Sequence, residues 1–241
     1  MPINTLFLDA GGVIVFPNWR LVSEALARHG VRVDPRALAA ADPHAKHQLD
    51  IGATIHLTDR QRGWLYFDLI LRHAGVELSD RTDAALAELH AYHMTSNLWE
   101  YLPADVPPAL DALRALGLRL VVVSNANGKL RELFERLGLA GRFDVMLDSS
   151  DEGVEKPDPR LFRIALERSG ASAETTLHVG DLYHVDVIGA RAAGLGAVLF
   201  DAADLYAEYD CPRVRSLEEL IEGLKTGQFE EKGGPVTSDE P

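Results

Sequence analysis

The chain has 241 residues and carries 37 acidic against 24 basic side chains, which gives a net charge of −13. Such a charge disfavours nucleic acids and anionic membranes as partners. The single cysteine excludes an internal disulfide and favours a reducing compartment. The first residues lack the basic segment of a signal peptide, and no apolar run approaches the roughly 18 residues that a membrane span needs. We therefore expect a cytoplasmic protein with no nucleic-acid or membrane partner.

Five short apolar runs, each bounded by turn residues, predict β-strands. They are Thr5–Leu8, Leu118–Val123, Phe143–Leu147, Thr176–Val179 and Ala197–Phe200. Helical patterns that end next to a glycine lie between the later runs, at Pro108–Leu116, Lys129–Leu137, Asp158–Ser169 and Val185–Ala193. Strands that alternate with helices predict an α/β fold with a doubly wound, parallel, Rossmann-like sheet.

About a hundred residues separate the first predicted strand from the second, far more than one crossover connection needs. Apolar side chains recur there with helical spacing, at Trp19–Gly30, Arg60–Ala74 and Arg81–Met94. We expect an all-helical cap domain at residues 16–103, inserted into a catalytic core of residues 1–15 and 104–225. Pro17 and Pro103 mark the expected hinge points. Residues 226–241 contain little to bury and predict a disordered acidic tail.

Polar side chains follow four of the predicted strands at their carboxyl ends, where doubly wound sheets bind ligands. They are Asp9 after the first strand, Ser124 and Asn125 after the second, Lys156 in the loop after the third, and Asp181 and Asp186 after the fourth. Each residue alone has an ordinary explanation as a helix cap, a turn residue or a solvated side chain. Their joint occurrence at one edge of the sheet predicts a single active site.

These residues lie in four motifs that resemble those of the haloacid-dehalogenase-like hydrolase superfamily. The motifs are Leu6–Val13, Val122–Asn125, Lys156-Pro157 and His178–Asp186, whose two aspartates are separated by four residues. The predicted helical insert is similar to the C1 cap of subfamily one. The resemblance spans roughly residues 3–200 and implies a magnesium-dependent hydrolase that acts on a phosphorylated small molecule.

The resemblance also implies a role for each motif residue. Asp9 would be the nucleophile and form a covalent aspartyl intermediate, with Ser124 and Lys156 as further catalytic residues. The implied ligands of Mg²⁺ are Asp9, the backbone carbonyl of Gly11, Asp181 and, in support, Asp186. The implied substrate-binding residues are Gly12, Ser124, Asn125 and, from the cap, Lys46.

Gly11 departs from the family pattern, because phosphatases of the family usually carry a second aspartate there as general acid and base. General acid–base catalysis typically raises the reaction rate by a factor of roughly 10²–10⁴. Without it, a substrate with a poor leaving group should be hydrolysed slowly. One interpretation is a working phosphatase that uses a cap residue as acid or a substrate that needs none. A second is phosphonatase- or dehalogenase-like chemistry, where Lys46, the only lysine of the cap, would form a Schiff base. A third is a weakly active module that binds a phosphorylated ligand.

Other residues of the predicted insert admit simpler explanations. His44, Lys46 and His47 cluster between two predicted helices, where side chains could face the cleft. His90 and His93 are spaced by one helical turn, which fits a solvated helix face better than a metal site. Trp19, Trp64 and Trp99 are interpreted first as packing residues of the insert and second as a substrate-facing wall. The sequence is compatible with a monomer and with a homodimer.

Overall fold

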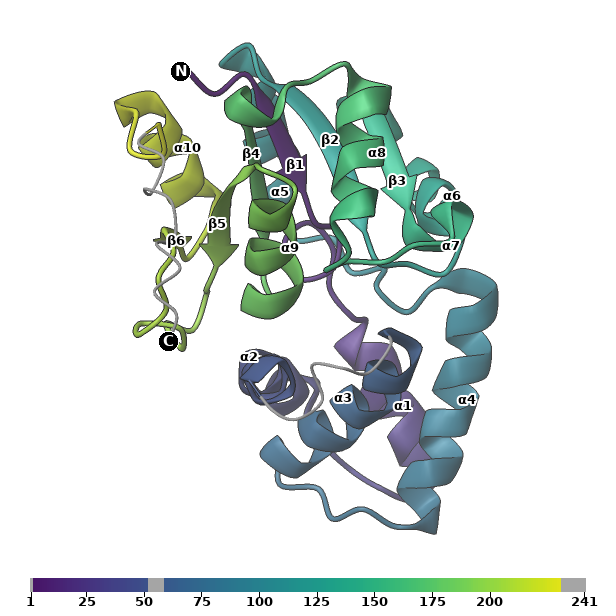
Figure 1. The fold of residues 1–241 in the computed structure, drawn as a ribbon. Helices are drawn as coiled ribbons and strands as arrows, with labels where there is room; N and C mark the ends of the chain where they lie inside the picture. The colour runs from purple at the N-terminus through teal and green to yellow at the C-terminus, as the bar shows by residue number, and fades with distance from the viewer. Residues whose placement is uncertain (1, 52–58, 231–241) are drawn as a thin grey trace, which may run out of the picture.

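The computed structural model describes residues 2–51 and 59–230, which form a parallel sheet with helices on both faces and a helical insert below it (Figure 1). The strand order is β3-β2-β1-β4-β5-β6. The strands are β1 (Thr5–Leu8), β2 (Arg119–Ser124), β3 (Val145–Asp148), β4 (Thr176–Gly180), β5 (Gly196–Phe200) and β6 (Arg213–Val214). The first five confirm the predicted runs to within two residues. The short β6 was not predicted, because two residues carry no periodic pattern.

The core helices pack on the two faces of the sheet because successive strand residues point to opposite sides. Leu6 and Leu8 contribute to one apolar cluster and Phe7 to another. The first face is covered by α5 (Val106–Ala115), α6 (Leu130–Arg136) and α10 (Leu217–Thr226). The second is covered by α8 (Pro159–Ser169) and α9 (Ile188–Ala192), which follows the π-helical segment η4 (Tyr183–Val187). The short helix α7 (Ser149–Glu152) follows β3, and 3-10 turns occupy Ala140–Arg142 and Ala173–Thr175. The predicted doubly wound fold is confirmed.

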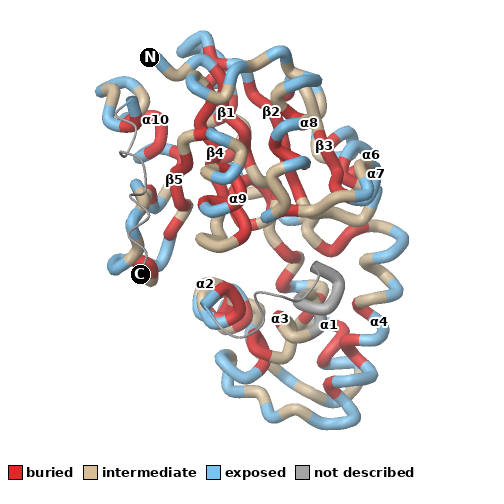
Figure 2. Tube along the Cα trace, in the orientation of Figure 1, coloured by how far each residue is buried: buried red, intermediate tan, exposed pale blue. Residues whose placement is uncertain are grey.

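In the part of the insert that the structure describes, four helices pack around an apolar cluster of their own, separate from those of the sheet. Figure 2 shows buried residues both in these helices and in the sheet. The helices are α1 (Trp19–Arg28), α2 (Pro35–Ile51), α3 (Asp59–His73) and α4 (Asp80–Ser96). Residues 52–58, including His56, lie outside the described residues, and so does the side chain of Trp64. Within the described ranges, no helix has both the length and the apolar character required to cross a membrane.

Helix α2 was not predicted. Pro43 lies inside it, and charged side chains occupy part of its buried face, so the apolar periodicity that marks an amphipathic helix is weak. His44, Lys46 and His47 therefore lie within a helix, and the prediction that they fall between two helical stretches is wrong.

The two chain segments that connect the sheet to the insert are hydrogen-bonded to each other. Phe16 and Tyr101 exchange backbone hydrogen bonds of 2.9 and 3.0 Å, and Asn18 N–H donates to Leu98 O at 2.9 Å. The predicted hinge residue Pro17 lies inside this paired region. The assignment of residues 16–103 as a cap domain remains a prediction.

The described chain continues past α10 as a packed segment. Gln228 N–H donates to Gly223 O at 2.9 Å, and Phe229 is buried against the sheet cluster that includes α10. The predicted disordered tail is therefore wrong for residues 226–230, because one aromatic side chain anchors this polar stretch. Residues 231–241 lie outside the described residues.

Candidate active site

The carboxyl ends of β1, β2 and β4 bring the predicted site residues together. Leu8 is paired with Val122 of β2 and with Val179 of β4, and Asp9 N–H donates to Val179 O at 2.9 Å. The residues that follow these pairs therefore meet at one edge of the sheet. Ser124 is buried there and lines the same cavity as Asp9.

Lys156 connects two of the predicted acidic residues. Its Nζ lies 3.0 Å from Asp9 Oδ1 and 2.7 Å from Asp186 Oδ1, and its side chain is only 1% exposed. Burial by itself would lower the pKa of Lys156, but Asp186 and Asp9 raise it above its ordinary value. Lys156 is therefore an ammonium group held between two carboxylates.

Asp186 is fixed by further donors. The His178 Nε2 atom lies 2.9 Å from its Oδ1, and Leu182 N–H donates to Oδ2 at 3.0 Å. Burial by itself would raise the pKa of Asp186, but Lys156 and His178 hold it below the usual range. Asp186 is thus an anion that orients Lys156, and His178 is a packed and hydrogen-bonded residue of β4.

Asn125 orients Lys156 from its backbone. Lys156 N–H donates to Asn125 Oδ1 at 2.7 Å, and Asn125 Nδ2 donates to Lys156 O at 3.0 Å. The family resemblance implies substrate binding for Asn125, and its two hydrogen bonds to Lys156 were not predictable because they join loops 31 residues apart. Substrate binding by Ser124 and Asn125 remains a prediction.

Three carboxylates form a cluster in which a cation could bind. Asp9, Asp181 and Asp186 each offer one oxygen atom, and these atoms lie within 4.8 Å of one another. Burial, together with Asp9 and Asp186, raises the pKa of Asp181 to about 7, although Lys46 opposes the shift. Burial also raises the pKa of Asp9, against the effect of Lys156. The carboxylates outnumber the two lysines beside them, so this oxygen-rich set fits a hard divalent cation.

Lys46 enters the site from the insert. Its Nζ lies 2.6 Å from Asp181 Oδ2 and 3.4 Å from Asp42 Oδ2, and Tyr66 OH donates to Asp42 at 2.6 Å. Burial by itself would lower the pKa of Lys46, but Asp181 and Asp42 raise it above its ordinary value. The structure thus places Lys46 in the site as an ammonium group. Contact with substrate remains a prediction.

Gly11 and Gly12, which follow Asp9 closely in the chain, lie where a larger side chain would meet other residues of the site. Gly12 has a φ of +84°, and a Cβ there would overlap the Asp181 carboxylate and lie 2.5 Å from Lys46 Nζ. A Cβ on Gly11 would lie 3.3 Å from Trp99 Cδ1. The indole of Trp99 therefore covers the place into which a side chain at position 11 would project. This position fits the second interpretation of Trp99, a substrate-facing wall, but its contact with position 11 was not predicted.

A cavity of about 640 Å³ extends from the strand ends into the insert. Its wall on the insert side is mostly aromatic and aliphatic, formed by Tyr66, Phe67, Leu86, Leu89, His93, Met94, Leu98 and Trp99. The rings of Tyr66 and Trp99 stack with centroids 5.9 Å apart. His93 is half-buried and accepts Leu98 N–H through Nδ1 at 3.1 Å, so its predicted solvated position is wrong. Burial lowers the pKa of His93, and His90 adds to this shift.

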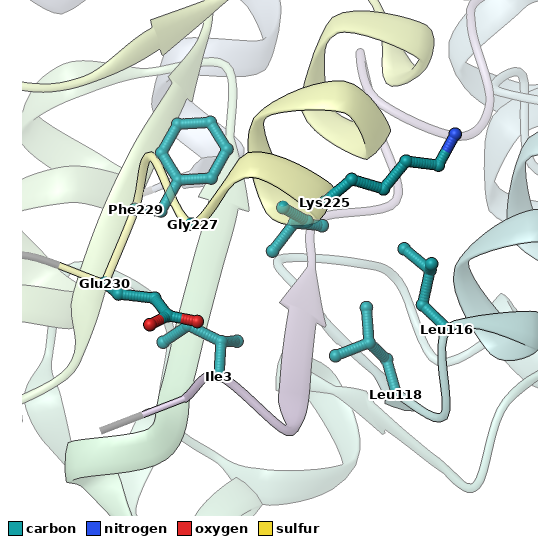
Figure 3. A pocket seen from close by; sticks show the side chains of 8 residues that line it. Ile3, Leu116, Leu118, Lys225, Gly227, Phe229 and Glu230 are labelled. Carbon is teal, nitrogen blue, oxygen red and sulfur yellow. The ribbon is translucent and has the colours of Figure 1, made fainter.

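A smaller hollow of about 140 Å³ lies near the amino ends of the strands, away from the candidate active site (Figure 3). Ile3 precedes β1 and Leu118 precedes β2, so this hollow lies at the amino ends of the strands. Ligands of doubly wound sheets bind at the carboxyl ends. The hollow is therefore a packing gap beside α10 and is not part of the active site.

The parallel sheet, with a cluster of acidic residues at the carboxyl ends of its strands, defines an α/β protein with a candidate cation site. A profile of the haloacid dehalogenase-like hydrolase family matches residues 3–194. The chain belongs to this family, which confirms the resemblance found in its motifs.

Relatives of known name share large parts of the chain. Haloacid dehalogenase-like hydrolase domain-containing protein 3 of Bos taurus is 32% identical over 183 residues, 71% of this chain and 70% of the relative. Glyceraldehyde 3-phosphate phosphatase of Methanopyrus kandleri is 37% identical over 134 residues, 55% of this chain and 57% of the relative.

The crystal structure of 2-haloacid dehalogenase from Pseudomonas syringae pv. Tomato superposes with a TM-score of 0.58 at 24% identity. The match covers 93% of this chain and 99% of that chain. At this identity the likeness concerns the fold alone, so it does not distinguish a phosphatase from a dehalogenase.

Proposed function

We propose that the protein is a magnesium-dependent phosphatase that hydrolyses phosphorylated small metabolites through an aspartyl intermediate on Asp9. The observation that carries this proposal is the Asp9 carboxylate, 3.0 Å from Lys156 Nζ and within a cluster of three acidic side chains. The glyceraldehyde 3-phosphate phosphatase among the relatives supports a phosphorylated substrate.

The first step forms a bond between Asp9 and phosphorus. Ala10 N–H at 2.7 Å and Lys156 Nζ at 3.0 Å both engage Asp9 Oδ1, which fixes the carboxylate plane and leaves Oδ2 to attack. The bond from phosphorus to the leaving oxygen breaks as the Oδ2–P bond forms. Water then attacks the phosphorus of the aspartyl phosphate, which releases inorganic phosphate and restores the carboxylate.

Positive charge must offset the repulsion between a carboxylate and a phosphate dianion. Lys156 supplies one ammonium group, and the hydroxyl of Ser124 with the backbone amide of Asn125 would hold phosphoryl oxygens. Mg²⁺, held by Asp9, Asp181 and the carbonyl of Gly11 with Asp186 in support, would supply the remaining charge.

The site lacks an evident proton donor for the leaving group among the described residues. Gly11 offers no proton, Trp99 covers the adjacent space, and Lys46 is a poor proton donor because its pKa is raised. We therefore expect the enzyme to favour substrates whose leaving group departs without protonation, such as acyl phosphates, over simple alkyl phosphates.

The alternative chemistries fit the geometry less well. A dehalogenase of this superfamily uses no magnesium and has no need for the buried acids Asp181 and Asp186. A phosphonatase needs a neutral lysine amine to form a Schiff base. Lys46 reaches the site but is paired with Asp181 and Asp42, which favour its charged form. Borohydride trapping of Lys46 with an aldehyde substrate would support the phosphonatase instead.

The decisive experiment measures phosphate release from an aryl phosphate and an acyl phosphate with Mg²⁺. Asp9→Asn should lower kcat by at least about 10⁴-fold, because it removes the nucleophile. Asp80→Asn, at the exposed start of α4, serves as a matched control and should retain full activity. Ligand binding without turnover would favour the phospho-ligand-binding module, and unchanged turnover in Asp9→Asn would exclude the proposed mechanism.

A further inference from the structure

Helix α2 carries three charged side chains at intervals of four residues. Asp42, Lys46 and Asp50 therefore share one face of the helix. Asp42 and Asp50 are 5% and 4% exposed, and the Lys46 side chain is 14% exposed. Charged groups are seldom buried unless they are paired, so this face must be matched by partners. For Asp50 those partners lie outside the insert.

Asp50 binds two parts of the sheet domain. Its carboxylate accepts Tyr183 N–H at 2.8 Å and His184 N–H at 3.1 Å, at the start of η4. The hydroxyl of Tyr206, in the loop after β5, donates to it at 3.1 Å. These partners lie 133 to 156 residues away in sequence. Hydrogen bonds to a buried charged group are among the stronger ones in proteins.

The contact of Lys46 with the core is made one turn earlier on the same helix. Lys46 lies 2.6 Å from Asp181, and Asp50 binds the backbone of Tyr183, two residues further along the same loop. One residue of an α-helix corresponds to a rotation of about 100° and a rise of about 1.5 Å. A shift of α2 by one residue would therefore break both contacts together.

We propose that Asp50 is a positioning residue that fixes the register of α2 on the loop after β4 and thereby holds the Lys46 ammonium in the active site as a contact for the substrate's anionic group. The role given to Lys46 rests on the proposed phosphatase function. The effect of Asp50 on the placement of Lys46 does not rest on it, because both contacts are made between residues of the chain itself.

Asp148 provides a matched control for this inference. It is also a buried carboxylate, and it accepts Gly128 N–H at 2.8 Å and Ser150 N–H at 3.0 Å. Both partners lie in segments that follow β2 and β3, on the sheet side of the molecule. Asp148→Asn should therefore lower the free energy of unfolding through weakened hydrogen bonds without moving Lys46.

The first measurement is independent of activity. The protein is treated with an amine-acetylating reagent, and the labelling rate of each lysine is followed by mass spectrometry. Asp50→Asn should raise the labelling rate of Lys46 about tenfold, while the exposed Lys129 and the buried Lys156 keep their rates. Asp148→Asn should leave the labelling rate of Lys46 unchanged. An unchanged Lys46 rate in Asp50→Asn would overturn the inference.

The second measurement is a double-mutant cycle on KM for the best substrate of the panel. Asp50→Asn and Lys46→Met should each raise KM about tenfold with a smaller change in kcat, and the double variant should resemble Lys46→Met alone. Asp148→Asn should change KM by the same small factor in the wild-type and in the Lys46→Met background. Multiplicative effects of Asp50→Asn and Lys46→Met would show that Asp50 does not act through Lys46.

Tyr206→Phe keeps the cycle usable if Asp50→Asn does not fold, because it removes only one hydroxyl donor to Asp50. Its smaller increase in KM should likewise vanish in the Lys46→Met background, and a persistent increase would count against the inference. The positioning role of Asp50 and the proposed phosphatase function can fail independently in these experiments. Loss of turnover in Asp9→Asn together with multiplicative effects at Asp50 and Lys46 would leave the phosphatase standing and remove only the positioning role.

Discussion

The two sides of the active-site cavity are built in different ways. On the side of the sheet, Asp9, Lys156 and Asp186 form a buried network with distances of 3.0 Å or less. On the side of the insert, a single ammonium group from Lys46 meets a wall of aromatic and aliphatic side chains. In the proposed mechanism, the sheet side holds the groups that make and break bonds, and the insert side shapes what can bind beside them.

This difference predicts a graded response to substitution. Changes in the buried network should affect both stability and turnover, because each charge there compensates another. Changes on the insert side should alter the range of substrates more than the chemistry itself. Three experiments, given in order of decreasing expected effect, test this contrast between the two sides of the cavity.

The largest effect is expected for Lys156→Met. Removing the ammonium leaves Asp9 and Asp186 without their shared partner, so we expect a loss of about 3–5 kcal/mol in the free energy of unfolding. Turnover should fall by about 10²–10³-fold through the lost contact to the phosphoryl group. Denaturant unfolding and phosphate release measure the two effects. Lys129→Met, at an exposed site, is the control, and equal behaviour of the two variants would contradict the contrast.

An intermediate effect is expected from metal binding. Mg²⁺ at 100 times its Kd should stabilise the folded protein by about 2.7 kcal/mol, because it binds the folded state alone. Thermal unfolding with and without a chelator measures this gain, and Asp181→Asn should abolish it. Asp148→Asn replaces another buried carboxylate at a strand end and should keep the metal-dependent shift. A shift that survives in Asp181→Asn would place the metal elsewhere.

The smallest effect is expected at Gly11, where the two sides meet. Gly11→Asp restores a general acid and should raise kcat for an alkyl phosphate by about tenfold, with little change for an acyl phosphate. Trp99 lies 3.3 Å from the added Cβ and must give way, so the gain should be larger in combination with Trp99→Phe. Steady-state rates on both substrates measure it. The absence of a gain in both backgrounds would show that a missing acid does not limit the rate.

The sequence predicted which side chains gather on the sheet side of the cavity, while their roles stay predictions. Asp9, Lys156, Asp181 and Asp186 each follow a strand of a parallel sheet, and the carboxyl ends of such strands converge whatever the loops do. Lys46 was singled out because it is the only lysine of residues 16–103, although its helix was not predicted. Asp50 and Trp99 carried no such signal, since one buried carboxylate and one aromatic residue are common in any helical segment.

The positions of five strands along the chain, the parallel sheet and the acidic cluster at the carboxyl ends of its strands were predictable from local patterns of apolar runs, glycines and polar residues, because strand pairing turns these patterns directly into proximity. The register of α2, the contact of Asp50 with η4 and the cover of Trp99 over Gly11 were decided only by the tertiary structure. These contacts join segments up to 156 residues apart, and their positions depend on how one helix packs across a cavity, which no local pattern encodes.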